Sequence, residues 1–211
     1  MNSSNEFYLL LGDVLSSRKI KNREKFQSKI IESSSKLNNI YEKDFYAKLS
    51  IIKGSDEIGA VLVNLRPVYP IINFLSQYLY PNYLRFVVVK GAIDTSVSTK
   101  DVSKMDGPVF HQAADYMLSL KQEKLIFKMD TQNFITDTLI SNNINLLYLL
   151  KKKWSPSKNR IIAQYKKTRK QKLTAEKLGL KQQTVSYHLQ SAQYKEIEKI
   201  EQNLMEVFNR I

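Results

Sequence analysis

The sequence predicts an α+β domain over residues 1–150, followed by a small all-α helix-turn-helix domain over residues 151–211. Three observations carry this prediction. Short apolar stretches alternate with segments of helical spacing in the first part. Their order, β-α-ββ-α-β-α-β, is typical of a sheet with helices on one face. A boundary between helical segments is then predicted at Ser155-Pro156, because proline disfavours a helical conformation of the residue before it.

The strands of the first domain are predicted by apolar runs. The continuous run Phe7–Leu15 indicates a strand that is buried on both faces. Lys48–Ile52 and Glu57–Val63 flank a Gly-Ser-Asp turn, which predicts a hairpin. Leu84–Val89 and Lys124–Met129 predict two further strands.

The helices of the first domain are predicted by apolar residues that recur three or four positions apart. One such pattern covers residues 26–40. A second opens at Pro67 and Pro70, since proline is tolerated in a first turn. Pro108–Leu120 and residues 131–150 predict two more helices.

Composition excludes several classes of protein. The absence of cysteine excludes a disulfide-bonded scaffold and a cysteine-ligated zinc site, and two histidines are too few for an all-histidine metal centre. No apolar run approaches the roughly 18 residues of a membrane span. These features predict a cytoplasmic protein without a membrane partner.

The net charge of +13 is unevenly distributed. Residues 151–211 contain 15 Lys and Arg against 5 Asp and Glu, whereas residues 1–150 contain 18 against 15. Such a basic segment beside a near-neutral domain is typical of a nucleic-acid-binding module. The alternative is a solvated basic tail.

The segment Leu173–Leu189 has helix-turn-helix spacing. Gly179 is predicted to supply the turn, because the residue after a helix commonly needs a positive φ. Val185 and Leu189 would face the core of the domain. The other side of the second helix would then reach base edges and phosphates of double-stranded DNA through Lys181, Gln182, Gln183, Thr184, Ser186, Tyr187 and Gln190. The alternative is a plain helical hairpin with a solvated polar face.

This segment resembles the helix-turn-helix of bacterial regulators, notably the promoter-reading region of sigma factors. A preceding helix is predicted over Arg160–Lys172. It would bring four basic side chains near the phosphates: Lys166, Lys167, Arg169 and Lys170.

The last helix carries a heptad-like seam. Its members are Ile197, Ile200, Leu204, Val207 and Ile211. At barely two heptads, the seam is too short to hold a homodimer alone. It could extend a dimer interface through the C-terminal helix, or it could dock on the core.

Two acidic residues are placed at strand ends. Asp13 ends the first predicted strand and Asp56 lies in the hairpin. If these strands are neighbours, both carboxylates lie at one edge of the sheet, where oxygen ligands suit Mg²⁺. The alternative is that both residues serve turns.

The stretches Leu11-Gly12-Asp13-Val14, Ser55-Asp56-Glu57 and Asp106-Gly107-Pro108 resemble the SatD family of bacterial proteins. The resemblance covers residues 7–150. It implies a palm-like (ferredoxin-like) sheet, similar to class III nucleotide cyclases and GGDEF domains, in which Asp13 and Asp56 would hold metal and a nucleotide could bind.

The same resemblance also implies what is missing. Cyclases place an arginine on the helix after the Gly-Pro segment, where this chain has Phe110–Asp115 without one. Losing a cation at the transferring phosphate removes a large catalytic term. Arg18 and Arg85 are the substitutes, with Arg85 expected at the far end of its strand.

Two functions follow from these observations. The first is a DNA-binding, transcriptional regulator that is not an enzyme, whose palm-like domain binds a ligand or mediates assembly. The alternative is a metal-dependent nucleotide enzyme with a nucleic-acid-binding arm.

Overall fold

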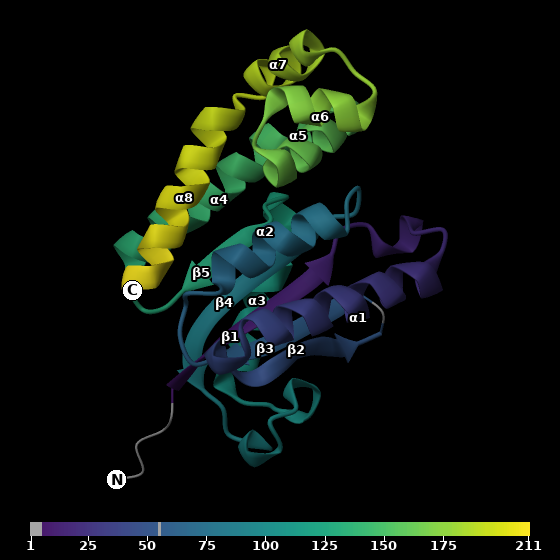
Figure 1. The fold of residues 1–211 in the computed structure, drawn as a ribbon. Helices are drawn as coiled ribbons and strands as arrows, with labels where there is room; N and C mark the ends of the chain where they lie inside the picture. Colours follow the sequence, from purple (N-terminus) through teal and green to yellow (C-terminus); the bar gives the residue numbers. More distant parts are fainter. Residues whose placement is uncertain (1–5, 55) are drawn as a thin grey trace. The chain divides into compact units, whose positions relative to one another are not determined.

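The structure is a computed structural model that describes residues 6–54 and 56–211. The chain forms two compact units (Figure 1). The N-terminal unit comprises the residues up to Asn145 together with Val207–Ile211, and the C-terminal unit comprises Leu146–Glu206. Each unit is described by itself below.

The N-terminal unit is built on one five-stranded sheet. The strand order is β2-β3-β1-β4-β5, in which the first four strands pair antiparallel and β5 runs parallel to β4. The strands are β1 (Glu6–Val14), β2 (Phe45–Lys53), β3 (Glu57–Leu62), β4 (Leu84–Ala92) and β5 (Phe127–Asp130). All five were predicted, although β2 begins three residues before the predicted start and β4 ends three residues after the predicted end.

Three helices belong wholly to this unit: α1 (Arg23–Ile40), α2 (Val68–Tyr78) and α3 (Pro108–Glu123). The next helix, α4 (Phe134–Lys152), begins in the N-terminal unit and ends in the C-terminal one. The C-terminal unit adds α5 (Pro156–Thr168), α6 (Gln171–Leu178), α7 (Gln182–Ser191) and most of α8 (Tyr194–Arg210). No described helix is long and apolar enough to cross a membrane.

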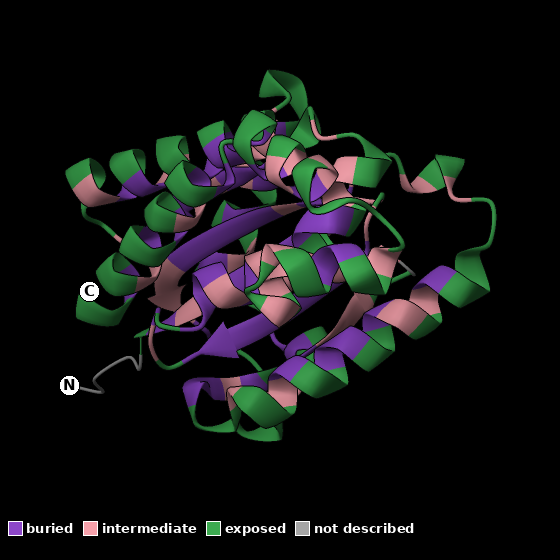
Figure 2. Ribbon diagram, turned by 45° about the horizontal axis from the view of Figure 1, so that its top comes forward, coloured by how far each residue is buried: buried purple, intermediate pink, exposed green. Residues whose placement is uncertain are grey.

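The prediction of helices on one face of the sheet is wrong, because both faces are covered. Leu9 and Leu11 of β1 pack in one core cluster with Val109 and Ala113 of α3. Leu10 points to the opposite face and is equally buried. Figure 2 shows long stretches of the strands in the colour of buried residues. On that side α1 contacts β2, and α2 contacts β4. The order of elements did not specify which face each helix takes, whereas the continuous apolar run of β1 correctly predicted burial on both.

The outer edge of β5 is closed by side chains of α4 instead of a further strand. Asn145 Oδ1 accepts hydrogen bonds from the amides of Ile126 (2.9 Å) and Phe127 (3.1 Å), and its Nδ2 donates to the Phe127 carbonyl. Ser141 Oγ accepts from the Met129 amide at 3.0 Å. An edge strand is thereby satisfied without exposing its backbone groups for pairing.

The C-terminal unit has a small apolar core of its own. It is formed by Ile161, Ile162, Ala175, Val185, Leu189, Ala192 and Tyr194. The helix before α6 is α5, which starts four residues earlier than predicted and ends at Thr168, because Arg169 has a left-handed φ of 56°.

Of the seam residues predicted on α8, Ile197 and Leu204 are buried. Ile200, Val207 and Ile211 are exposed, whereas Glu201 and Phe208 take buried positions. The buried Glu201 forms ion pairs with Lys151 of α4 and Lys166 of α5. The apolar pattern of α8 alone could not predict that a glutamate would be buried on this helix.

Candidate ligand pocket and nucleic-acid interface

The structure places the strand ends that carry Asp13 and Asp56 side by side. The amide of Val14 donates to the Asp56 carbonyl at 3.0 Å, and Asp13 is opposite Glu57 in the antiparallel register. The prediction that these two strands are neighbours is therefore confirmed. The two carboxylates nevertheless have different surroundings.

Asp13 is held between two cations. Its Oδ1 lies 3.2 Å from Nζ of Lys121, near the end of α3, and its Oδ2 lies 3.6 Å from Nη1 of Arg85. Arg85 is opposite Asp13 in the β1–β4 register, so its expected place at the far end of the strand is wrong. The start of β4 meets the end of β1 because the two strands run antiparallel.

Glu57 completes a half-buried cluster of charges with these residues. Burial raises the pKa of its carboxyl, and the nearby Asp13 carboxylate raises that pKa further, while Lys53 and Lys121 act in the opposite direction. The surroundings of Glu57 therefore disfavour the charged form of its carboxyl.

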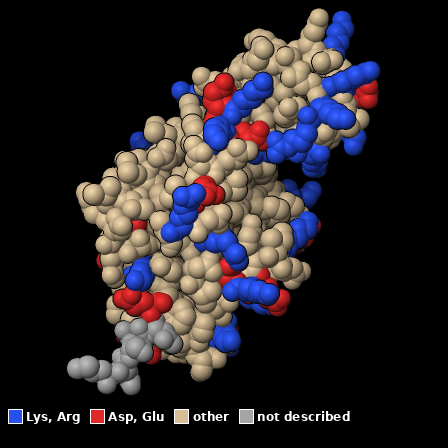
Figure 3. Space-filling view, turned by 60° about the vertical axis from the view of Figure 1, so that its left-hand side comes forward, with Lys and Arg blue, Asp and Glu red and all other residues tan. Residues whose placement is uncertain are grey.

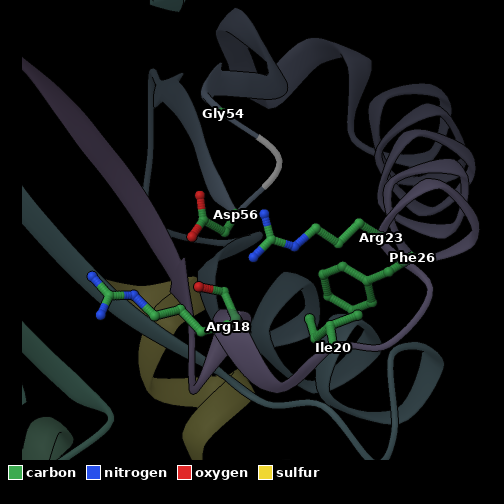
Figure 4. A pocket seen from close by; sticks show the side chains of 7 residues that line it. Arg18, Ile20, Arg23, Phe26, Gly54 and Asp56 are labelled. Carbon is green, nitrogen blue, oxygen red and sulfur yellow. The ribbon is translucent and has the colours of Figure 1, made fainter.

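Asp56 instead lines a cavity of about 280 Å³ between the end of β1, the start of α1 and the β2–β3 turn (Figure 4). Ser17, Arg18, Ile20, Arg23, Phe26 and Gly54 form the rest of its lining. Arg18 and Arg23 lie on either side of Asp56 in this view, and the Arg23 guanidinium extends toward its carboxylate. Within the described residues, neither arginine forms an ion pair, so both cations are available to a ligand.

Asp13 and Asp56 are each accompanied by two basic side chains at this edge of the sheet. Asp13 is already matched by two cations, and two further cations flank Asp56. Across residues 6–54 and 56–211, no group of three or more His, Asp and Glu side chains is arranged to hold a metal ion.

The Asp106-Gly107-Pro108 segment lies at the opposite end of the sheet. Gly107 comes close to Asp94 and Ala92, at the end of β4, where α3 begins. His111 is largely exposed there, 3.8 Å from Asp106, and thus far from Asp13. The residue of α3 that forms an ion pair with Asp13 is Lys121, near the C-terminal end of the helix.

In the C-terminal unit, α6 and α7 are joined by the predicted tight turn. Gly179 has a φ of 66°, as expected, and the Leu180 amide donates to the Ala175 carbonyl at 2.9 Å. Val185 and Leu189 of α7 are buried, so they anchor that helix to the small core.

The opposite face of α7 is polar and accessible. Lys181, Gln182, Gln183, Tyr187 and Gln190 are exposed, and Thr184 and Ser186 are partly exposed. Figure 3 shows Lys and Arg side chains gathered at the top of the view, over the helices of this unit. All seven predicted DNA-contacting residues of this segment are therefore at least partly accessible.

The four basic residues predicted on the preceding helix divide into two pairs. Lys166 is bound to Glu201 at 3.6 Å with its side chain only 22% exposed, and Arg169 is bound to Glu198. Lys167 and Lys170 are exposed and form no ion pair with any described residue. The second pair is therefore the one free to contact phosphates.

A comparison with protein families decides the classification. The model of the SatD family matches residues 7–207, nearly the whole chain. This chain belongs to the SatD family. The match extends through the C-terminal unit, so the earlier resemblance over residues 7–150 covered only part of it. No curated protein matches the sequence.

Among solved structures, this SatD-family chain is similar to a Regulator of Polyketide Synthase Expression from Bifidobacterium adolescentis. The identity is 13%, and the alignment covers 97% of this chain and 85% of the other. The TM-score is 0.27, which is too low for the likeness to support an argument about fold or function.

Two residues of the site in this SatD-family chain, Arg23 and Lys121, were not predicted from the sequence. Arg23 is an ordinary-looking first residue of a helix, and Lys121 is an isolated lysine near the end of α3. The length of α3 was the one available signal for Lys121. A helix of 16 residues spans roughly 24 Å, which is enough to cross the sheet from the Gly-Pro segment to Asp13.

Proposed function

We propose that this SatD-family protein is a DNA-binding regulator in which α6, the turn at Gly179 and α7 form a helix-turn-helix. The observation that carries the proposal is the exposed polar face of α7 above a buried apolar anchor. Amide and hydroxyl groups on such a helix match the donors and acceptors of base edges in the major groove.

The surrounding charge supports the same proposal. Residues 156–192 contain nine Lys and Arg and a single acidic residue. A duplex carries one phosphate charge per roughly 1.7 Å of its axis, so a surface of this kind attracts it strongly. A plain helical hairpin would not require such an excess.

The palm-like description of the N-terminal unit is also part of the proposal. The elements β1-α1-β2-β3-α2-β4, with antiparallel strand order β2-β3-β1-β4, agree with a ferredoxin-like split βαβ arrangement. In this description α3 and β5 are additions that cover the second face and extend the sheet.

DNA binding is tested with the full chain and random duplex DNA. We expect Lys170→Ala to weaken binding to all sequences alike and to reduce the dependence of log affinity on log salt by about one unit. Lys43→Ala removes the same charge from an exposed position in the N-terminal unit and is the matched control. Equal losses for the two variants would show that the basic surface attracts DNA without a defined interface.

Base reading is tested separately, by selection from a random duplex library. We expect Gln183→Ala to change the selected sequence, because a lost bidentate base contact costs about 1–3 kcal/mol of discrimination. An unchanged motif would show that Gln183 does not read bases.

For the N-terminal unit we propose a small anionic ligand in the cavity between Arg18 and Arg23. Guanidinium groups suit phosphate oxygens, and Phe26 and Ile20 offer an apolar wall to the rest of the molecule. Binding of pyrophosphate to the full chain is measured by calorimetry. We expect Arg23→Ala to abolish its binding, whereas Lys21→Ala, which removes a charge two residues away outside the cavity, retains it. Equal binding to both variants would contradict a site at this cavity.

The alternative, a metal-dependent nucleotide enzyme, gains less support. Its first carboxylate, Asp13, is bound to Lys121 and Arg85. We expect no cyclised or polymerised product from nucleoside triphosphates with Mg²⁺ or Mn²⁺. Product that forms with the wild type and disappears in both Asp13→Ala and Asp56→Ala would support the enzyme function instead.

A further inference from the structure

The solvent-facing side of α4 is apolar. The helix buries Ile140, Ile144 and Leu147 on one side, as a core-facing helix should. On the other side Ile135 is 71% exposed, Leu139 and Leu146 are each 58% exposed, and Leu149 is 47% exposed. A helix that is apolar all round is normally covered, and a contiguous exposed patch of this kind marks an interaction site.

The same face carries no charge. Between Phe134 and Leu150 the only charged residue is Asp137, which is buried and accepts hydrogen bonds from the amides of Thr131 and Asn133. In a chain that is 25% charged residues, 17 residues of helix without an exposed charge are unusual.

The positions on this face are symmetric about Asn142 to within one residue. Ile135, Leu139, Asn142, Leu146 and Leu149 follow one another at spacings of 4, 3, 4 and 3. Seven residues separate Asn142 from Ile135 on one side and from Leu149 on the other. All five lie on a single uninterrupted helix.

We propose that this face of α4 binds the α4 of a second copy of the chain, antiparallel, with a two-fold axis at Asn142. Ile135 then packs on Leu149 of the second copy, Leu139 packs on its Leu146, and the two Asn142 amides meet at the centre. A face that is its own complement is what a two-fold interface requires. A single polar residue within an apolar seam fixes the register of a helix pair.

Charge identifies the occupant as a second copy. Two chains of +13 each repel one another, so association is least opposed at a surface free of Lys and Arg. The face of α4 meets that condition, and a neutral surface is matched by its own copy. Binding to an anionic membrane would instead be favoured by lysines along the flanks of the face, where α4 has Thr, Ser and Asn up to residue 145.

The first test is the mass of the full chain in solution by sedimentation equilibrium. We expect about twice the 24.6 kDa of one chain for the wild type and the monomer mass for Leu139→Glu. Leu118→Glu is the matched control, because Leu118 of α3 is 57% exposed outside the proposed face, and this variant should remain a dimer. A monomeric wild type, or a dimeric Leu139→Glu, would overturn the proposal. So would binding of a monomeric wild type to anionic lipid vesicles.

The second test uses the absence of cysteine from the chain and does not depend on Leu139→Glu folding. We expect Asn142→Cys to form a disulfide-linked dimer on mild oxidation, because the axis brings position 142 next to its own copy. Leu150→Cys should not, since eight residues from the axis place the two thiols roughly 24 Å apart. Mixed Phe134→Cys and Leu150→Cys chains should cross-link to each other. Equal self-linking at positions 142 and 150 would indicate a parallel pair and refute the geometry, whatever the DNA-binding experiments show.

Discussion

Glu57, at the start of β3, ties the stability of the N-terminal unit to pH. Its pKa is raised by burial and then by Asp13, so the folded chain holds a proton there more tightly than the unfolded chain does. Stability from this group is therefore present at acid pH and is lost as pH rises through the folded pKa.

We expect Glu57→Gln to raise the midpoint of thermal unfolding at pH 7, since it removes a charge that the fold disfavours. The difference from the wild type should shrink as the pH falls and Glu57 becomes neutral. Glu42→Gln removes an exposed carboxylate in the same unit and is the control, with a smaller effect at either pH. A Glu57→Gln protein that is less stable than the wild type at pH 7 would show that the carboxylate is a net stabilising partner of Lys53 and Lys121.

Lys166 shows what the sequence could and could not reveal about the candidate site. Its basic surroundings predicted a phosphate contact, but its partner Glu201 lies 35 residues away on a helix whose phase was assigned from apolar residues alone. The polar face of α7 was easier to predict, because Val185 and Leu189 fix its phase within a single helix. Local spacing thus predicted the exposed polar residues of α7, whereas the ion pair of Lys166 depends on a contact that is distant in sequence.

At the scale of elements, the turn at Gly179 is required by backbone conformation and not by space. A Cβ added there would meet nothing within 4 Å, while its φ of 66° is unfavourable for residues with a side chain. We expect Gly179→Ala to lower the free energy of unfolding by about 1–2 kcal/mol. Gly179→Asn should cost less, because asparagine tolerates this conformation. Equal losses for the two variants, measured by chemical denaturation, would point to another cause.

The junction of α4 with β5 depends on Asn145. Replacing it with alanine leaves the amides of Ile126 and Phe127 without their acceptor, and each buried unsatisfied group costs about 1–3 kcal/mol. We expect Asn145→Ala to destabilise the chain by about 2–4 kcal/mol in urea unfolding. Asn143→Ala removes an exposed amide two residues earlier in the same helix and should change stability by less than about 0.5 kcal/mol.

The elements themselves were largely predictable because each has a local cause. Apolar runs identified the strands, proline and glycine marked α3, α5 and the turn before α7, and the spacing of apolar residues identified the helices. The face that each helix covers was not predictable, because it depends on crossovers between strands that are far apart in sequence. The sheet order β2-β3-β1-β4-β5 was not predictable for the same reason.

At the scale of the whole molecule, the proposed function assigns the net charge of +13 to the encounter with DNA. If about 4–6 phosphates are neutralised, the logarithm of the affinity should fall with the logarithm of the salt concentration at a slope of about 4–5. Titration of the full chain with duplex DNA by fluorescence anisotropy between low and physiological salt measures this slope. A flat response would contradict an electrostatic interface.

The closure of β5 by α4 also determines how the sheet edge exchanges hydrogen with solvent. The amides of Ile126, Phe127 and Met129 bond to side chains of Asn145 and Ser141, so deuterium can reach them only when those side chains withdraw. Their exchange rates therefore report the departure of one helix and not the fraying of a strand. All three amides should lose protection together, and a ligand that holds α4 in place should slow all three by the same factor.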